Sequence, residues 1–345
     1  MRKKITSILS LVLALTMVLA LAACGGSTES SAPESTAPEA TVPEGESSAP
    51  EASGTDWPTK PVTLVVPASA GGDTDMNARI FAKYLGEELG QTVVISNISG
   101  ISVAFEELKN AANDGYTVGV YHPGFFVSSQ LGTIDVSWED FETGSVYAID
   151  NQSAWFVSKD APYQTLDELA AASKEGPIGF ATEVGSMSHL TELLFMDLVP
   201  GSQINIVDAG GSAEKITALM SGQLDLMFNQ VGLVKDYLEN GDFVCIGVMS
   251  EERSKANPDI PTFKEQGYDM VFDKPYWTFF PAGTDQAIVD KMCEATEAVC
   301  ANPDYAAELL ETMQTVPGNM THDETVEYLA GIDAMYAEIL GGVNG

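Results

Sequence analysis

From residue 62 onward, short apolar runs alternate with amphipathic stretches that have the helical period. The first series contains predicted strands at 62–66, 92–96 and 117–121. One predicted helix begins after Thr74, and a second covers about 103–111. Such alternation is typical of parallel α/β units, in which helices cover both faces of a sheet. The sequence therefore predicts an α/β lobe with a doubly wound, mostly parallel sheet.

The same pattern restarts after Ser158, which predicts a second lobe of the same kind. Its helices and strands are expected, in chain order, at 166–173, 178–181, 188–198, 204–207, 213–220, 224–228, 233–238 and 243–249. The C-terminal part adds an extended segment at 276–280 and helices at 286–300, 303–312 and 321–340. Thr321 and Glu324 have the spacing of a capping box at the start of the last helix. We assign this part to the first lobe, with crossings between the lobes near 154–157 and 245–249.

The first 23 residues predict a signal peptide, because basic residues at positions 2–4 precede an apolar run over 5–21. The stretch 21–25 resembles a bacterial lipobox, in which Cys24 becomes the mature N-terminus and carries diacylglycerol. An ordinary cleavage site with a chance cysteine is the alternative. We expect an exported protein that is anchored through this lipid to the outer face of the cell membrane, or is periplasmic.

Residues 24–56 are rich in Ser, Ala, Pro, Glu, Thr and Gly and contain almost no large apolar side chains. Such a segment cannot bury enough surface to offset its ordering entropy, so we expect a disordered tether. The predicted organisation is a signal peptide at 1–23, a tether at 24–56, lobe 1 at 57–157 and 246–345, and lobe 2 at 158–245.

Charge and the scarcity of reactive motifs narrow the function. A formal net charge of −34 makes nucleic acid and anionic membrane surfaces poor partners. There is no phosphate-binding loop and no zinc-protease motif, and Cys245, Cys293 and Cys300 lack metal-ligand spacing, so we interpret them as buried apolar residues. We expect no cofactor, no metal, no enzymatic activity and a monomer.

Three loops join a strand to a helix at the edge where α/β sheets bind ligands, and helix N-termini offer free N–H groups there. They cover 67–75, 182–189 and 208–212. Ordinary turn and capping chemistry is the alternative for each loop alone, but three in two lobes indicate a shared cleft. The residues expected to bind a ligand are Ser69, Gly71, Gly72, Thr74 and Asp75 in the first loop, Gly185, Ser186 and Ser188 in the second, and Gly210, Gly211 and Ser212 in the third.

Several segments together match one family pattern in number, order and spacing: 57–67, 71–75 with Arg79, 114–117, 185–190, Gly211 with 218–228, 260–268 and 281–284. On these segments, the span from residue 57 to about 340 resembles the extracytoplasmic solute receptors of tripartite tricarboxylate transporters, the Bug family. The resemblance implies a two-lobed, type II periplasmic-binding-protein-like fold that closes on a small carboxylate, often a di- or tricarboxylate or an acidic amino acid. It also implies delivery to small and large integral-membrane permease subunits that an ion gradient drives.

Departures from the family pattern leave the ligand's charge open. Asp73, Glu183 and Asp208 add carboxylates around the loops, and Asn229 replaces a common acid. Like charges at short range repel by several kcal/mol at an intermediate dielectric constant. The ligand could therefore carry an amino group, or be neutral or cationic.

Several residues have two interpretations. Arg79 could pair with a ligand carboxylate, although a salt bridge to Asp75 fits its helical spacing better. The aromatic residues near the expected mouth could enclose a ligand or pack in the core; they are Tyr121, Phe125, Tyr276 and Trp277.

Two other functions remain as alternatives. One is a ligand sensor for a signalling partner. The other is an exported hydrolase built on Ser186, Ser188 and His189, although a nucleophile elbow needs glycine two residues after its serine.

Overall fold

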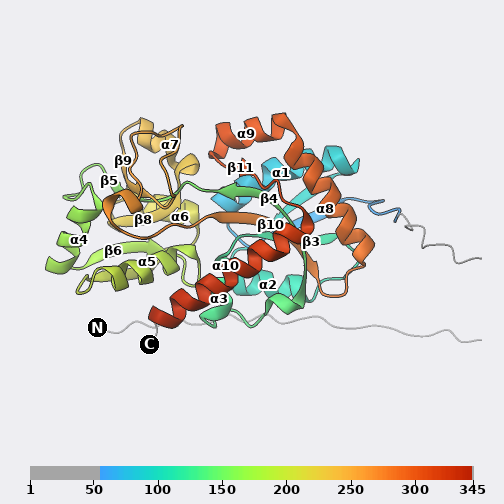
Figure 1. Ribbon diagram of the computed structural model, residues 1–345, viewed down its shortest axis with the longest axis horizontal. Coiled ribbons are helices and arrows are strands. Elements are labelled where there is room, and N and C mark those ends of the chain that lie inside the picture. The colour runs from blue at the N-terminus through green and yellow to red at the C-terminus, as the bar shows by residue number, and fades with distance from the viewer. Residues whose placement is uncertain (1–54, 344–345) are drawn as a thin grey trace, which may run out of the picture. The chain divides into compact units, whose positions relative to one another are not determined.

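The computed structural model describes residues 55–343, which form two α/β lobes that lie side by side (Figure 1). The predicted signal peptide, Cys24 and almost all of the predicted tether lie outside the described residues. Within 55–343, no helix combines the length and apolar character that a membrane crossing needs.

Lobe 1 is built around a six-stranded sheet with the order β11-β4-β10-β3-β1-β2. β1 pairs in parallel with β2 and β3, while β10 is antiparallel to both β3 and β4. The bounds are β1 (Val62–Val66), β2 (Val93–Asn97), β3 (Thr117–Tyr121), β4 (Phe141–Asp150), β10 (Lys274–Pro281) and β11 (Val316–Pro317).

Lobe 2 is built around a five-stranded sheet with the order β7-β6-β8-β5-β9. β6 is parallel to β7 and β8, whereas β5 is antiparallel to β8 and β9. Both sheets are therefore mixed, because strands next to the lobe crossings, such as β10 and β5, run antiparallel to the parallel strands. The bounds are β5 (Ser153–Ser158), β6 (Ile178–Thr182), β7 (Ile204–Asp208), β8 (Leu226–Gln230) and β9 (Phe243–Val248).

Helices cover both faces of each sheet (Figure 1). Those of lobe 1 are α1 (Asp73–Leu89), α2 (Ile101–Lys109), α3 (Gly124–Gln130), α8 (Gln286–Ala301), α9 (Pro303–Met313) and α10 (His322–Val343), with a 3-10 turn at Trp138–Asp140. Those of lobe 2 are α4 (Leu166–Glu175), α5 (Met187–Leu198), α6 (Ser212–Met220) and α7 (Val231–Glu239), and a second 3-10 turn lies at Lys264–Gln266.

The structure places two segments differently from the sequence prediction. The residues predicted to cross between the lobes lie in β5 and β9, which pair within the second sheet. The predicted boundaries at 157 and 246 thus fall inside strands. We propose crossings at residues 151–152 and between β9 and β10, because these segments join one sheet to the other.

Local sequence chemistry sets the helix ends. At the start of α10, the Thr321 amide donates to Glu324 at 2.9 Å and the Glu324 amide donates to the Thr321 hydroxyl at 3.3 Å, which confirms the predicted capping box. Asn302 caps α9 by accepting from the Asp304 amide, and Pro303 occupies the first turn, where its missing N–H costs nothing. These caps orient the C-terminal helices against the first lobe.

Three thiols of the described chain are free. Cys293 and Cys300 are buried in the core of lobe 1, as predicted, whereas Cys245 is only partly buried.

The two lobes share a packed boundary. The largest cluster of buried apolar side chains continues from Phe105 of lobe 1 to Trp155 of lobe 2. α10 lies along this boundary, where the Tyr336 hydroxyl donates to the Met187 sulfur of α5 at 3.2 Å. On the α7 side, Gly232 lies directly against the backbone of Met313 at the end of α9, so a Cβ there would clash with the Met313 carbonyl.

We predict that Gly232→Ala lowers the free energy of unfolding by about 1–3 kcal/mol, because overpacking at a rigid backbone contact displaces the two helices. The measurement is urea denaturation. Gly331→Ala in α10 is the control, since nothing lies within 4 Å of its added Cβ. Equal stability of the two variants would contradict a tight contact between α7 and α9.

Candidate ligand-binding site between the lobes

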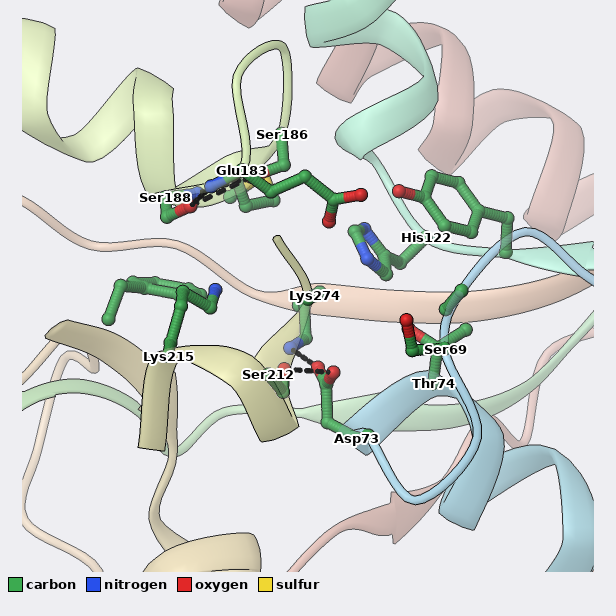
Figure 2. A pocket seen from close by; sticks show the side chains of 16 residues that line it. Ser69, Asp73, Thr74, His122, Glu183, Ser186, Ser188, Ser212, Lys215 and Lys274 are labelled. Carbon is green, nitrogen blue, oxygen red and sulfur yellow. Dashed lines mark hydrogen bonds and ion pairs between the residues drawn. The ribbon is translucent and has the colours of Figure 1, made fainter. Parts of the chain in front are cut away.

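The N-termini of α1 and α6 meet across the cleft. Asp73 is the first residue of α1 and Ser212 the first of α6, and the Ser212 hydroxyl donates to Asp73 Oδ1 at 2.7 Å (Figure 2). Neither helix has a side-chain cap. The first-turn amides of both helices therefore lack intrahelical partners at the positive ends of two helix dipoles.

A chain of hydroxyl groups forms the third wall, at the start of α5. Ser188 Oγ lies 2.7 Å from Thr182 Oγ1 and 2.8 Å from Ser186 Oγ. Ser186 also caps α5 by accepting from the Ser188 amide at 3.2 Å. These hydroxyls can each reorient to donate or accept, which suits a polar ligand.

A buried ion cluster lies below the helix ends. The Lys274 ammonium lies 2.5 Å from Asp73 Oδ2 and 3.3 Å from Asp150 Oδ2, and Tyr276 donates to Asp73 at 3.0 Å. Burial opposes the charge of Asp73, but the neighbouring Lys274 ammonium holds the pKa of Asp73 well below its usual value. Asp73 is thus charge-compensated, which corrects the expectation that it would repel an anion.

Lys215 of α6 has no such compensation. Its side chain is only 4% exposed, and within residues 55–343 its ammonium forms no hydrogen bond or salt bridge; it lies 5.5 Å from the centre of the Phe228 ring. Burial lowers the pKa of Lys215, and the charges of Asp73 and Glu183 act in the opposite direction. A buried ammonium without a partner is costly, and a bound anion would offset that cost.

These groups enclose one small cavity of about 30 Å³ (Figure 2). Its lining brings together most of the predicted residues, namely Ser69, Gly72, Thr74, Ser186, Ser188, Gly211 and Ser212. The sequence prediction omitted several of the other lining residues, including His122, Lys215, Phe228 and Lys274.

Four of the residues predicted to bind a ligand lie outside this cavity. Asp75 accepts from the Gly71 amide at 2.7 Å and from Arg79 at 2.9 Å, so it holds the first loop in shape and Arg79 forms the predicted salt bridge. The Gly185 carbonyl accepts from Ser128 at 2.5 Å. The Gly210 amide donates to Asp208, beside an adjoining hollow that shares Ser69, Glu183 and Gly211 with the cavity.

Each of the two histidines near the cleft accepts a backbone hydrogen bond at Nδ1. The Gly124 amide donates to His122 Nδ1 at 3.0 Å, which leaves the ring proton on Nε2. Burial, assisted by Lys274, lowers the pKa of His122 to about 3. The Gly185 amide donates to His189 Nδ1 at 3.3 Å, so His189 supports the loop, and within residues 55–343 no hydrogen bond joins it to a serine as a hydrolase would require.

The expected aromatic residues are core residues. Tyr121, Phe125, Tyr276 and Trp277 are each at most 1% exposed. Tyr121 also lines the cavity. Tyr276 does not line it, but its hydroxyl donates to Asp73, which does.

Glu183 is the one acidic side chain in the cavity lining besides Asp73. No group within residues 55–343 donates a hydrogen bond to its carboxylate, although its own backbone amide donates to Ser188. Burial raises the pKa of Glu183 to about 7; Lys215 opposes this shift, and the charges of Asp73 and Asp208 add to it.

A second acid, Glu192 of α5, lies buried near the hydroxyl chain with neither carboxyl oxygen hydrogen-bonded in the described structure. Burial raises the pKa of Glu192 to about 9. A nearby Thr182 hydroxyl acts to lower this pKa, but less strongly than burial raises it. The hydrogen-bond partner of that hydroxyl is Ser188, at 2.7 Å. Glu192 is therefore protonated at neutral pH.

We predict that Glu192 makes the protein less stable as pH rises from 7 to 8.5. Its ordinary pKa is 4.5 and its folded pKa is about 9, so in this window only the folded state holds the proton. Stability then falls by up to about 1.4 kcal/mol per pH unit, and Glu192→Gln should remove that slope. The measurement is denaturant unfolding at several pH values.

Glu175→Gln, at the end of α4, is the matched control and should keep the wild-type slope. An unchanged slope in Glu192→Gln would show that Glu192 is ionised in the folded protein.

Comparison with known proteins identifies the family. Residues 77–339 match the family described as "Tripartite tricarboxylate transporter family receptor". A protein of Cupriavidus necator, "UPF0065 protein in gbd 5'region", is 28% identical over 81% of this chain and 86% of its own length. Protein BugT of Bordetella pertussis is 28% identical over 70% of this chain and 76% of its own length.

Solved structures share the fold. The periplasmic binding protein BugD superposes with a TM-score of 0.77 at 26% identity, covering 84% of this chain and 99% of BugD. The R. palustris protein Rpa4515, solved with adipate, gives a TM-score of 0.78 at 27% identity, covering 84% of this chain and 99% of its own. The chain is therefore a periplasmic-binding-protein-like solute receptor that belongs to the tripartite tricarboxylate transporter receptor family.

Proposed function

We propose that this receptor captures a small carboxylate in the cavity between the lobes and delivers it to the permease subunits of an ion-gradient-driven transporter. The observation that carries the proposal is Lys215, a buried ammonium without an anionic partner in the described chain. A ligand carboxylate would supply that partner, and a charge-assisted hydrogen bond contributes more than a neutral one.

The surroundings of Lys215 support an anion as well. The uncapped first turns of α1 and α6 point unpaired amides at the same cavity, and His122 has its proton on the nitrogen that is free of the backbone. The Asp73 charge that would oppose an anion is offset by Lys274. Capture requires these donors alone, so no covalent chemistry is needed.

Capture also requires movement. A cavity of about 30 Å³ holds little more than a water molecule, so a dicarboxylate cannot enter while the lobes are in this arrangement. We propose that the lobes open about the crossing segments at 151–152 and between β9 and β10, and close on the ligand as other hinged receptors do. The adipate of Rpa4515 supports a carboxylate as the class of ligand.

We further propose export and lipid anchoring through Cys24, followed by the tether at 24–56, which would let the lobes reach the permease from the membrane surface. Cys24 and almost all of the tether lie outside the described part of the chain, so the proposal depends on their sequence.

Lys215→Met keeps most of the side-chain volume and removes the charge. We predict that it weakens carboxylate binding about 10- to 100-fold, which is the range for loss of a hydrogen bond to a charged group. Isothermal titration with adipate, succinate and malate measures this effect.

Lys174→Met, on the exposed surface of α4, is the matched control and should bind as the wild type does. Wild-type affinity in Lys215→Met would contradict the role of Lys215.

For the anchor, we predict that the wild-type protein expressed in a bacterium sediments with membranes and that Cys24→Ala does not. Membrane fractionation followed by immunoblotting measures the distribution. The same distribution for both proteins would mean that Cys24 carries no lipid.

A further inference from the structure

The polar side chains that line the cavity are almost all hydrogen-bond donors or hydroxyls, which can donate or accept. The exceptions are two carboxylates, Asp73 and Glu183. Asp73 already accepts from Ser212, Lys274 and Tyr276. Glu183 is the remaining carboxylate, and no side chain or amide within residues 55–343 donates to it.

Glu183 and Lys215 do not neutralise each other. Both line the same cavity, Glu183 from the loop after β6 and Lys215 from α6, but no salt bridge of the described chain joins them (Figure 2). The cavity thus contains one unpaired positive group and one unpaired negative group on separate walls. Lys215 is buried and Glu183 is partly buried, so each charge is costly to desolvate unless a ligand pairs with it.

We propose that the ligand is an amino acid, with its carboxylate bound by Lys215 and the helix ends, and its ammonium bound by Glu183. This inference rests on the proposed function and adds the residue that selects the substrate class. A zwitterion pairs with both groups at once and leaves the net charge of the closed cavity unchanged. A plain dicarboxylate pairs with Lys215 but places a second negative charge in the cavity with Glu183, which repels it at short range.

A hydroxy acid is a weaker match for the same reason. Its hydroxyl can donate to Glu183, but it leaves the negative charge of this partly buried side chain without a counter-ion. Only a cationic group offsets that charge, so the structure favours an ammonium over a hydroxyl.

The experiment compares matched ligands that differ only in the amine. The full chain, purified in detergent, is titrated calorimetrically with alanine and propionate, aspartate and succinate, and glutamate and glutarate. We expect the amino acid of at least one pair to bind at least about tenfold more tightly than its partner, the size of effect that one charge-assisted contact gives. Malate is included beside aspartate and should bind more weakly than aspartate.

The Glu183→Gln variant tests the residue. The preference for the amine should fall to near one, while the acid without an amine binds as well as before or better. Glu175→Gln is the control, because Glu175 is an exposed acid at the end of α4, outside the cavity, and it should keep the preference.

The pH dependence gives a second readout with opposite signs for the two ligand types. The charges that act on Glu183 are those of Lys215, Asp73, Asp208 and Glu214. Because Glu183 titrates near neutral pH, amino acid binding should strengthen from pH 6 to pH 8 and binding of the amine-free acid should weaken. Both trends should be absent in Glu183→Gln.

Three results would overturn the inference: equal or tighter binding of the amine-free acid in every pair, equally tight binding of malate where aspartate binds, or a preference that survives in Glu183→Gln. In each of these cases the receptor still binds carboxylates and the proposed function stands. Absence of binding by every ligand, adipate included, would overturn the proposed function together with this inference.

Discussion

The buried ion pair of Asp73 with Lys274 determines both the shape and the charge of the cleft. Asp73 begins α1, Lys274 begins β10, and Ser212 of the opposite lobe donates to the same carboxylate. One carboxylate therefore links two elements of lobe 1 to the start of α6 in lobe 2. Since a buried charge that loses its partner costs several kcal/mol, the ion pair strongly favours a fixed position of α1 relative to β10. The Ser212 hydroxyl adds a single hydrogen bond from α6, which can break when the lobes open.

The same pair leaves a specific charge pattern for the ligand. With Asp73 occupied, Lys215 and Glu183 are the two charged groups of the cavity lining that lack a partner in the described chain. The uncapped helix ends and His122 add donors near the cavity. A small acid matches this pattern, and a small acid that also carries an ammonium matches it completely.

The fold was largely predictable from the sequence because strand and helix periods are local properties. The strands β1, β3 and β6 and the helices α1, α5 and α8 lie within a few residues of their predicted positions. β4 was missed and β5 was taken for a crossing, since each pairs with strands far away in sequence and its place depends on tertiary contacts.

The candidate site was predictable only where loop chemistry marks it. Glycine and serine residues before helices identified Ser69, Gly72, Ser188 and Ser212, all of which line the cavity. Lys215 was identifiable in principle, because it lies one helical turn after Gly211 on α6. Lys274 was not, since its partners Asp73 and Asp150 come from distant parts of the chain.

A crystal structure of the protein with a bound amino acid tests the central claim most directly. The account predicts a ligand carboxylate within hydrogen-bond distance of Lys215 Nζ and of the first-turn amides of α1 and α6, with the lobes closed around it. A ligand carboxylate that contacts neither Lys215 nor these amides, or one bound outside the cleft, would contradict it.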